Sequence, residues 1–340
     1  MNSFNFKYPD HRPRRIRGNA VLREMLRETR FSAEQLMMPY FVRAGRNIKE
    51  PIASMPGQYR FSPDALLKEL DTLASSGVRS ILLFGLPETK DEKASASYSS
   101  KSVIVQAVKA IKKRFPEIAV TTDVCLCAYT NHGHCGLLSA DGYIKNDASL
   151  GVLAKMALAH AEAGVDMLSP SDMMDGRIQA IRSQLDGKGF EELPLMSYSA
   201  KYSSSFYGPF RDAAHSAPAQ SEGLKRPAPK DRKGYQMDFS NREEALREIA
   251  LDIQEGTDII LIKPVLAYLD ILREAKNTFC FPTAAYIVSG EYAMVKAAAQ
   301  KGWVNEKESV LEILTSVFRA GADLVITYHA KEAAIWGGSK

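Results

Sequence analysis

The chain has 340 residues, of which 45% are hydrophobic and 25% are charged. This balance is typical of a globular enzyme and excludes a disordered chain, a collagen-like fibre and a coiled coil. No apolar run reaches the roughly 18 residues of a transmembrane helix, and residues 1–18 lack the apolar stretch of a secretory signal peptide. We therefore expect a cytoplasmic protein.

The net charge of +4 is unevenly distributed along the chain. Residues 1–30 carry eight basic and three acidic side chains, and residues 197–236 carry seven and three. No nucleic-acid-binding motif accompanies these basic segments. We therefore interpret them as contacts for an acidic small substrate or for an acidic neighbouring subunit.

One pattern recurs four times: an amphipathic helical segment, a glycine, and then a short apolar run. The glycines are Gly77, Gly164, Gly256 and Gly321. Glycine is favoured directly after a helix because it adopts positive φ without a steric penalty. A wholly apolar run is typical of a parallel strand that is covered on both faces. The pattern predicts repeated helix–strand units.

Eight apolar runs are predicted strands, and helical patterns lie between most of them. In chain order the runs cover residues 36–42, 80–85, 118–124, 166–169, 194–199, 258–263, 284–289 and 323–328. Eight such units in a chain of this length favour a (β/α)8 TIM barrel over a doubly wound open sheet. The alternative is a two-domain α/β protein.

Two segments lie outside this repeat. Residues 1–30 precede the first strand and form an arginine-rich arm that is too short to fold alone. Residues 203–236 follow the fifth strand and are rich in Ser, Ala, Pro, Gly and cations. A connection of this length is usually a lid or a disordered insertion, and barrel active sites lie at the carboxyl ends of the strands. We predict an active-site lid here, within a catalytic domain spanning residues 31–340.

The third predicted strand leads into a cysteine-rich loop, DVCLCAYTNHGHCG. Cys125 and Cys127 are two residues apart on an extended segment, so their sulfurs point to the same side. Gly133 allows the loop to bring Cys135 back towards them. Three thiolates suit Zn²⁺ and leave its fourth coordination position open. The alternative is a set of buried free thiols.

Other residues near this loop have predicted places as well. His132 and His134 are interpreted either as partners behind the metal ligands or as alternative ligands. Asp123, which ends the third strand, is a candidate for proton transfer. The fourth cysteine, Cys280, precedes the seventh strand and is expected in the core.

Two lysines end neighbouring predicted strands. Lys263 closes the apolar run Ile-Ile-Leu-Ile, and Lys201 ends the fifth strand. An apolar barrel mouth disfavours the charged form of Lys263, and a second cation lowers its pKa further. The result is the neutral amine that Schiff-base formation requires. The alternative is a solvated lysine, which for Lys201 alone would be the ordinary interpretation.

The remaining polar residues indicate an anionic substrate. Cations on the predicted lid are suited to pair with a carboxylate: Arg211, Lys225, Arg226, Arg232 and Lys233. Ser289 and Tyr328, at the ends of the last two strands, offer neutral hydroxyl donors to a second carboxylate. The alternative for Tyr328 is a residue at the edge of the core.

Eight segments, in order across nearly the whole chain, resemble the porphobilinogen synthase (5-aminolevulinate dehydratase) family. They are RPRRIR at 12–17, TDVCLCAYTNHGHCG at 122–136, SPSDMMDGR at 169–177, SYSAKYSSSFYGPFRDA at 197–213, DRKGYQM at 231–237, ILIKP at 260–264, YIVSGEYAM at 286–294 and VITYHA at 325–330. The resemblance implies a TIM barrel with an N-terminal arm, assembled as a homo-octamer. It also implies condensation of two 5-aminolevulinate molecules to porphobilinogen, with loss of two waters, in tetrapyrrole (heme) biosynthesis.

The resemblance further implies roles for single residues. Lys263 and Lys201 would each form a Schiff base with one substrate, and Asp123 would transfer protons. Cys125, Cys127 and Cys135 would hold a catalytic zinc ion, as in the zinc-dependent members. One substrate carboxylate would be bound by Arg211, Arg232 and Gln236 with Lys233 nearby, and the other by Ser289 and Tyr328, while Tyr207 would pack in the pocket. Glu248 would bind an allosteric Mg²⁺ between subunits.

Two other functions remain open on the sequence. A Schiff-base class I aldolase on a TIM barrel would also use a lysine on the sixth strand, but it needs neither a three-cysteine loop nor a second lysine. A non-catalytic barrel stabilised by zinc would act through subunit contacts, and metal chelation would unfold it.

Overall fold

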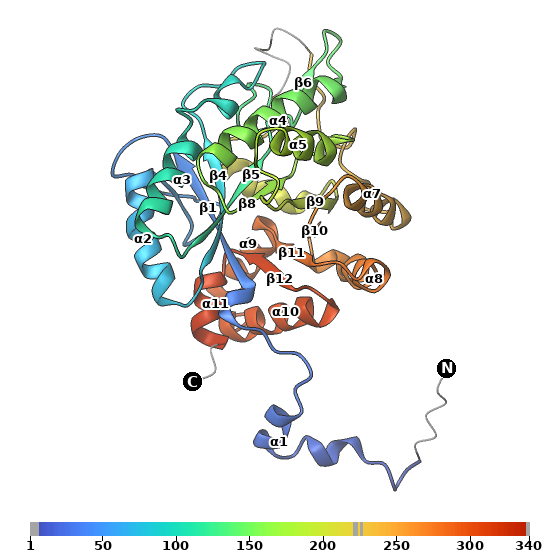
Figure 1. The fold of residues 1–340 in the computed structure, drawn as a ribbon. Coiled ribbons are helices and arrows are strands. Elements are labelled where there is room, and N and C mark those ends of the chain that lie inside the picture. Colours follow the sequence, from blue (N-terminus) through green and yellow to red (C-terminus); the bar gives the residue numbers. More distant parts are fainter. Residues whose placement is uncertain (1–6, 220–223, 225–226, 338–340) are drawn as a thin grey trace.

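Eight parallel strands surround the centre of the molecule (Figure 1), in a computed structural model that describes residues 7–219, 224 and 227–337. Hydrogen-bonded neighbours follow the order β8-β5-β4-β1-β12-β11-β10-β9, and a bridge between Leu168 and Leu195 joins the two ends. The strands are β1 Leu36–Arg43, β4 Ser80–Leu86, β5 Ala119–Val124, β8 Met167–Pro170, β9 Met196–Lys201, β10 Ile259–Lys263, β11 Thr283–Ile287 and β12 Leu324–Thr327. Each lies within two residues of its predicted range. The predicted TIM barrel is confirmed, and the two-domain alternative is wrong.

Helices cover the outside of this barrel. They are α2 Pro63–Ser75, α3 Val103–Arg114, α4 Asn146–Glu162, α5 Arg177–Asp186, α7 Glu243–Gln254, α8 Leu269–Phe279, α9 Ser289–Gln300, α10 Glu306–Ala320 and α11 Ala330–Gly337. The four glycines of the recurring pattern have φ values of +88°, +92°, +100° and +123° in chain order. The prediction of glycine after a helix is therefore confirmed at all four positions.

Several shorter elements lie outside the eight strands of the barrel and the helices that cover it. They are α1 Ala20–Met25, α6 Gly208–Ala213, β2 Lys49–Pro51, β3 Tyr59–Phe61, β6 Leu137–Leu138 and β7 Ile144–Lys145, with 3-10 turns at Pro13–Ile16, Ala33–Gln35, Ser95–Tyr98, Ser205–Tyr207 and Leu266–Tyr268. Phe41 and Val42, near the carboxyl end of β1, pair with β3, and β3 also pairs with β2. The sequence pattern did not predict these pieces because none is long enough to show a period.

The core consists of two layers, because successive side chains of a strand point to opposite faces. One layer fills the barrel, with Phe41, Phe84 and Leu261 among its members. The other lies between the strands and the helices and includes Ile81 and Val120. The barrel interior becomes richer in tyrosine and polar groups towards the carboxyl ends of the strands, where the predicted site residues lie.

The alternation of side chains is interrupted in β9. Ser197 pairs with Ile260 and Ala200 pairs with Ile262, so β9 has one residue more than β10 between these pairs. Tyr198 points into the barrel before this bulge, whereas Ala200 points outwards after it. Lys201 consequently points inwards, although strict alternation from Tyr198 would have turned it towards the helices. A β-bulge re-aims a side chain in this way.

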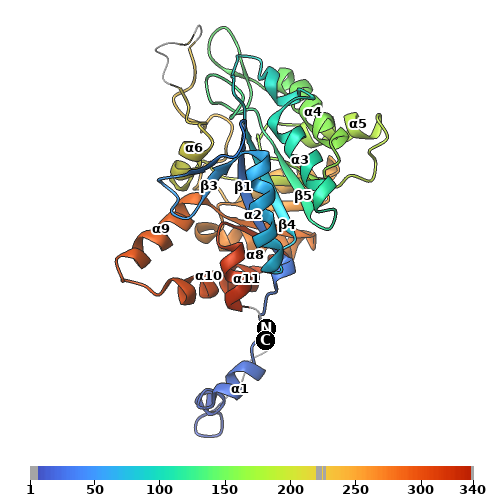
Figure 2. The ribbon, with the colours of Figure 1, turned by 90° about the vertical axis from the view of Figure 1, so that its left-hand side faces the viewer.

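The N-terminal arm leaves the barrel at the end where the strands begin, opposite the predicted site (Figures 1 and 2). Its described part, residues 7–30, is almost entirely exposed and carries the short helix α1. The Asn19 side chain caps this helix by accepting a hydrogen bond of 2.8 Å from the Val21 N–H. Among the helices of the described residues, none has the length and apolar character needed to cross a membrane.

Candidate active site

The cysteine-rich loop brings three sulfurs together at the end of β5. Cys125, Cys127 and Cys135 are buried, and their Sγ atoms all lie within 4.8 Å of one another. The carbonyl of Leu126 accepts hydrogen bonds of 2.9 Å from two later N–H groups, which turns the chain. Gly133 then returns it at φ +73°, as predicted from the sequence. The arrangement is that of a metal site with three sulfur ligands.

Positive charge lies beside these sulfurs. The Arg232 guanidinium is buried and donates hydrogen bonds to the carbonyls of Gly133 (2.9 Å) and Ser216 (2.6 Å). Hydrogen bonds from Cys125 and Cys127 lower the pKa of Cys135 well below its ordinary value, and Arg232 lowers it further. The site therefore favours a thiolate, the protonation state in which cysteine binds metal.

The two histidines of the loop lie outside the group of potential metal ligands found among the described residues. His134 contacts the predicted lid, with Nε2 2.9 Å from the Pro229 carbonyl and Nδ1 3.1 Å from the Tyr235 hydroxyl. Tyr235 also accepts a hydrogen bond of 3.3 Å from the Cys135 N–H. The group of potential metal ligands found among the described residues contains the cysteines alone. His134 therefore contacts the predicted lid and reaches the cysteine loop through Tyr235, and it does not belong to the group of sulfurs that could hold a metal ion.

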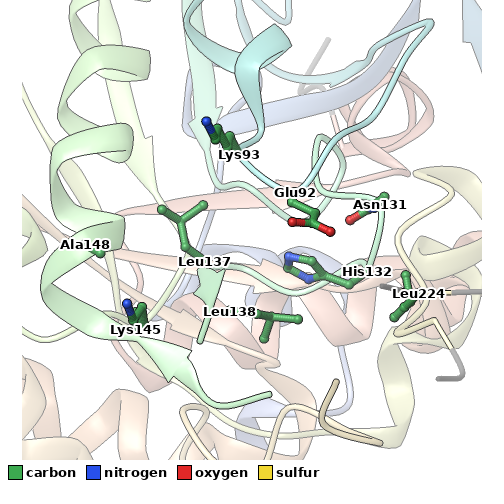
Figure 3. Close-up of a pocket in the computed structure, with 9 residues that line it drawn as sticks. All are labelled: Glu92, Lys93, Asn131, His132, Leu137, Leu138, Lys145, Ala148 and Leu224. Carbon is green, nitrogen blue, oxygen red and sulfur yellow. The ribbon is translucent and has the colours of Figure 1, made fainter. Parts of the chain in front are cut away.

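His132 faces a cavity of about 210 Å³ next to the loop (Figure 3). Its imidazole lies beneath the Glu92 carboxylate, with Asn131 beside it, and apolar side chains of Leu137 and Leu138 form the opposite side. Burial lowers the pKa of His132 to about 4, so the ring is neutral near pH 7. The three cysteines are not among the described residues that line this cavity.

Lys201 and Lys263 occupy paired positions on the adjacent strands β9 and β10. Both side chains are about 5% exposed. Their Nζ atoms lie 5.5 Å and 5.1 Å from the centre of the same Tyr198 ring. The two predicted lysines therefore meet at one place in the barrel mouth, and Lys201 is held there by a hydrogen bond that its Nζ donates to the Ser171 carbonyl.

Aromatic rings surround the Lys263 amine. The distances from Nζ to the ring centres are 4.3 Å for Tyr286, 5.0 Å for Phe210 and 5.2 Å for Tyr207. Burial lowers the pKa of Lys263 to about 7, and the neighbouring charge of Lys201 contributes to the decrease. These are the two causes that the sequence predicted. A substantial fraction of this amine is neutral and nucleophilic at pH 7.

Asp123 lies on β5 opposite Ser169 of β8 and is half-buried among the same groups. Burial raises the pKa of its carboxyl to about 6, although a hydrogen bond from Ser171 and the charges of both lysines oppose the increase. Its Oδ1 atom has no hydrogen-bond partner in the described part of the chain. A carboxyl with a pKa near neutrality beside two amines is suited to accept and return protons.

Three of the predicted anion-binding residues lie close together. Each has at least one side-chain polar atom that has no hydrogen-bond partner among the described residues. These atoms are Nε of Arg211, Nε of Arg232, and both Oε1 and Nε2 of the buried Gln236. Burial and the nearby Arg232 charge lower the pKa of Arg211. Two adjacent guanidinium groups favour an anion between them. Lys233 is exposed, and Lys225 and Arg226 lie outside the described residues.

The predicted hydroxyl donors also reach the barrel mouth. Ser289 Oγ accepts a hydrogen bond of 2.9 Å from the Phe210 N–H. The Tyr328 hydroxyl accepts one of 3.0 Å from Tyr286, and Tyr207 donates one of 3.2 Å to the Lys263 carbonyl. All three side chains are buried, and these contacts place them around Lys263.

Glu248 lies elsewhere, on the outer helix α7. It is half-buried, and burial raises the pKa of its carboxyl, with Asp252 and Asp175 adding to the increase and Arg177 opposing it. Asp252 and Asp175 are thus neighbours of Glu248. This group of carboxylates lies at a different place from the lysines and cysteines of the barrel mouth.

Two features of the site differ from the sequence interpretation or were missed by it. Cys280 is exposed, not part of the core. It ends α8 with φ +51°, so it belongs to a surface turn that precedes β11. Of the aromatic rings around Lys263, Tyr207 was predicted from the family resemblance, whereas Tyr198, Phe210 and Tyr286 were missed, although Tyr198 and Tyr286 lie on predicted strands. Two-residue alternation from the apolar residues Met196 and Ala284, both of which pack inside the barrel, would have placed these rings there too.

Comparisons with known proteins agree on one family. The family model for delta-aminolevulinic acid dehydratase matches residues 10–336. The delta-aminolevulinic acid dehydratase of Bacillus subtilis is 51% identical over 326 residues, which cover 96% of this chain and 98% of the relative. That of Archaeoglobus fulgidus is 51% identical over 328 residues, with coverage of 96% and 98%. A Toxoplasma gondii delta-aminolevulinic acid dehydratase, solved with its product porphobilinogen, is 44% identical with a TM-score of 0.91 and coverage of 96% and 91%.

Proposed function

The chain belongs to the delta-aminolevulinic acid dehydratase family, and from this premise we propose that it condenses two 5-aminolevulinate molecules to porphobilinogen with loss of two waters. The reaction makes the enzyme a hydro-lyase, and its pyrrole product is a precursor of heme. The observation that carries the proposal is the meeting of Lys201, Lys263 and three cysteine sulfurs at one barrel mouth. A class I aldolase would need only one of these lysines and no sulfur cluster.

Lys263 acts as a nucleophile in the proposed reaction. Its neutral amine attacks the ketone carbon of one substrate, and the resulting carbinolamine loses water to give a Schiff base. Lys201 forms the corresponding bond with the other substrate. Support comes from the buried position of both amines and from the pKa of about 7 at Lys263.

Asp123 is proposed to move protons during these steps. Each dehydration requires a proton for the departing hydroxyl, and ring closure requires removal of a proton from carbon. With a pKa of about 6, the Asp123 carboxyl is available in both protonation states near pH 7. It lies within electrostatic reach of both lysines, which is the place a shared acid–base group must occupy.

The three cysteines are proposed to hold Zn²⁺. The donors fit this ion because they are three converging, buried sulfurs, one of which favours the thiolate form. When bound, zinc supplies Lewis-acid polarisation of a substrate oxygen. The adjacent Arg232 helps to hold a thiolate by its positive charge.

The substrate carboxylates are proposed to bind at two places. Arg211, Arg232 and Gln236 carry unpaired polar atoms among the described residues and would bind one of them. Ser289 and Tyr328 would bind the other, and Tyr207 would pack against the substrate near Lys263. Residues 203–236 would close over the mouth as a lid. Support comes from their contacts with the cysteine loop, through the bond from Arg232 to Gly133 and the contact of Pro229 with His134.

A colorimetric assay for pyrrole formation from 5-aminolevulinate tests the proposal. We expect turnover in the presence of Zn²⁺, loss of turnover with a chelator, and recovery when zinc is added back. Borohydride should trap 5-aminolevulinate on both Lys201 and Lys263. An aldolase would give one adduct and no pyrrole, and a zinc-stabilised structural barrel would unfold on chelation.

The pH dependence of trapping follows from the low pKa of Lys263. Only the neutral amine reacts, so the rate of adduct formation at Lys263 should rise with pH and level off above a midpoint of about 7. Substitution of Lys201 by methionine removes a neighbouring cation that disfavours protonation of Lys263. The midpoint should therefore move to higher pH in that variant. Cyanoborohydride trapping from pH 5 to 9, with peptide mapping, measures both midpoints. A rate that still increases through pH 9 in the wild-type protein would contradict the assignment.

The arm is proposed to bind a second copy of the chain within a homo-octamer. Large apolar side chains of the arm are exposed in the single chain: Tyr8, Ile16, Val21, Leu22, Met25 and Leu26. Such a set is typical of a surface that another protein covers. The basic charge of the arm suits the acidic remainder of the chain. Glu248 would bind an allosteric Mg²⁺ at a subunit contact, where nearby carboxylates raise the pKa of its own carboxyl.

Deletion of residues 1–30 should leave smaller assemblies with weak activity. The barrel itself should keep its melting temperature, because the side chains of Arg12, Arg15, Arg23 and Arg30 donate hydrogen bonds to backbone carbonyls within the arm. Sedimentation and the pyrrole assay measure the two effects. A matched variant, Val21→Asp with Met25→Asp, alters one exposed face of α1 and should act in the same direction. An unchanged octamer with full activity would remove the proposal.

A further inference from the structure

The segment SPSDMMDGR contains a charged group that the proposed reaction does not use. Arg177, the first residue of α5, is 2% exposed and therefore belongs to the interior. Its Nη2 donates a hydrogen bond of 3.0 Å to Oδ2 of Asp252 on α7, which is equally buried. An ion pair removed from water in this way contributes little net stability, because desolvation offsets most of the attraction.

The same guanidinium also binds β9. Its Nη2 lies 3.0 Å from the Ser197 hydroxyl oxygen and 3.3 Å from the Tyr198 carbonyl. Ser197 in turn donates a hydrogen bond of 2.6 Å to Asp252. These contacts fall on the segment of β9 that bulges between its pairs with Ile260 and Ile262. The charge pair thus fixes the backbone at the point where alternation is broken.

A second branch of the network leads to the other side of Lys201. Nε of Arg177 lies 3.9 Å from Oδ2 of Asp172, which is completely buried in the connection between β8 and α5. The residue before it, Ser171, provides the carbonyl that accepts the hydrogen bond from the Lys201 amine. Arg177 therefore touches both the strand that carries Lys201 and the loop that receives its amine.

We propose that the buried Arg177–Asp252 pair, with Ser197, is a positioning device that holds the β9 bulge and so directs the Lys201 amine into the barrel mouth. The inference rests on the proposed function, since it concerns the lysine that is to bind the second substrate. If side chains alternated regularly along β9 from Tyr198 onwards, the Lys201 side chain would point towards the helices. None of the three residues of the device touches the reacting atoms, so its effect on the reaction is exerted through the position of Lys201.

The test compares adduct formation at the two lysines. Purified full-length variants are incubated with 5-aminolevulinate and cyanoborohydride, and labelled peptides are quantified by mass spectrometry. Asp252→Asn keeps the side-chain volume but removes the negative charge that pairs with Arg177. We expect the rate of adduct formation at Lys201 to fall by about 100-fold, the scale of a misplacement near 1 Å. Because the charge of Lys201 contributes to the low pKa of Lys263, the rate at Lys263 is compared on the plateau of its pH profile, where it should change by less than about twofold.

A second variant separates positioning from stability. Arg177→Met combined with Asp252→Leu replaces the ion pair by apolar groups, a change that is often neutral or stabilising in protein interiors. Removal of Arg177 takes away the cation that lowers the pKa of the buried Asp172, so Asp172 becomes protonated and leaves no unpaired charge. We therefore expect this double variant to melt near the wild-type temperature and still lose the Lys201 adduct. The matched control is Glu255→Ala. The Glu255 carboxylate joins the same two helices by accepting hydrogen bonds of 3.1 Å and 3.2 Å from Ile178 and Gln179, but it does not bind β9, and its loss should leave the Lys201 adduct unchanged.

The outcomes distinguish the inference from the proposed function. A folded double variant that forms the Lys201 adduct at the wild-type rate overturns the positioning role and leaves the proposed function intact. Equal losses at Lys201 and Lys263 also overturn it, because they indicate general loosening of the barrel. A wild-type protein that forms no adduct at Lys201 overturns the proposed role of that lysine, and this inference with it.

Discussion

Substitution of Lys263 by alanine should abolish pyrrole formation while leaving a folded oligomer. The change removes the proposed nucleophile, and loss of such a group lowers kcat by roughly 10⁴-fold or more. Folding should be little affected, because the folded protein already holds this amine at a pKa of about 7 by burial. Removal of a buried ionisable group therefore relieves a desolvation cost that offsets some of the lost packing.

Two measurements complete this prediction. Circular dichroism and sedimentation establish that the variant is folded and assembled, and the pyrrole assay gives its turnover. Lys263→Met is the matched control for packing, since it fills the space between Tyr286 and Phe210 with an uncharged chain of similar length. It should be as inactive as the alanine variant. Substantial turnover by either variant would falsify the assignment of Lys263 as the nucleophile.

Substitution of Cys127 by serine should lower bound zinc and activity together. A hydroxyl is a much poorer zinc ligand than a thiolate, so we expect at least about a 100-fold loss of metal affinity, more than the loss from altering a partner of a ligand. The melting temperature should change little, because the three cysteines are a small part of the apolar layer outside the barrel, which also contains Ile81 and Val120. Metal analysis, the pyrrole assay and calorimetry measure the three quantities.

The exposed Cys280 offers a matched control for this variant. Cys280→Ser makes the same chemical change at a surface turn and should keep full zinc content and turnover. Recovery of Cys127→Ser activity at high zinc concentration would further support a ligand role. Full activity of Cys127→Ser in metal-free buffer would instead indicate that the cysteines are structural.

The barrel and the places of Lys201, Lys263 and the three cysteines at its mouth could be predicted from the sequence because both depend on short-range patterns. Glycine after a helix and a wholly apolar strand are local signals, and they placed all eight strands within two residues. The convergence of Cys125, Cys127 and Cys135 was predicted from an extended segment and one flexible glycine; the glycine is confirmed, but β5 ends at Val124 and a turn at Leu126, not an extended chain, brings Cys125 and Cys127 together. The low pKa of Lys263 could be anticipated because it requires only an apolar strand and a nearby cation.

The remainder depends on contacts that a linear pattern does not contain. The bulge in β9 reverses which of the following side chains point into the barrel, and nothing in the sequence SYSAK indicates where the extra residue lies. The buried partnership of Arg177 with Asp252 joins positions 75 residues apart. Cys280 was assigned to the core from its residue type, but a left-handed turn exposes it. In each case tertiary packing overrides a preference that the sequence expresses locally.

The extra residue in β9 also affects how relatives of this chain should be aligned. A regular strand of unchanged length would keep the hydrophobic character and the overall fold, yet it would present the methyl group of Ala200 where an amine is needed. A regular strand that is one residue shorter would keep the lysine inside. Homologues should therefore be matched here by which residue faces the lumen, because a gap in this strand of an alignment is compatible with retained chemistry.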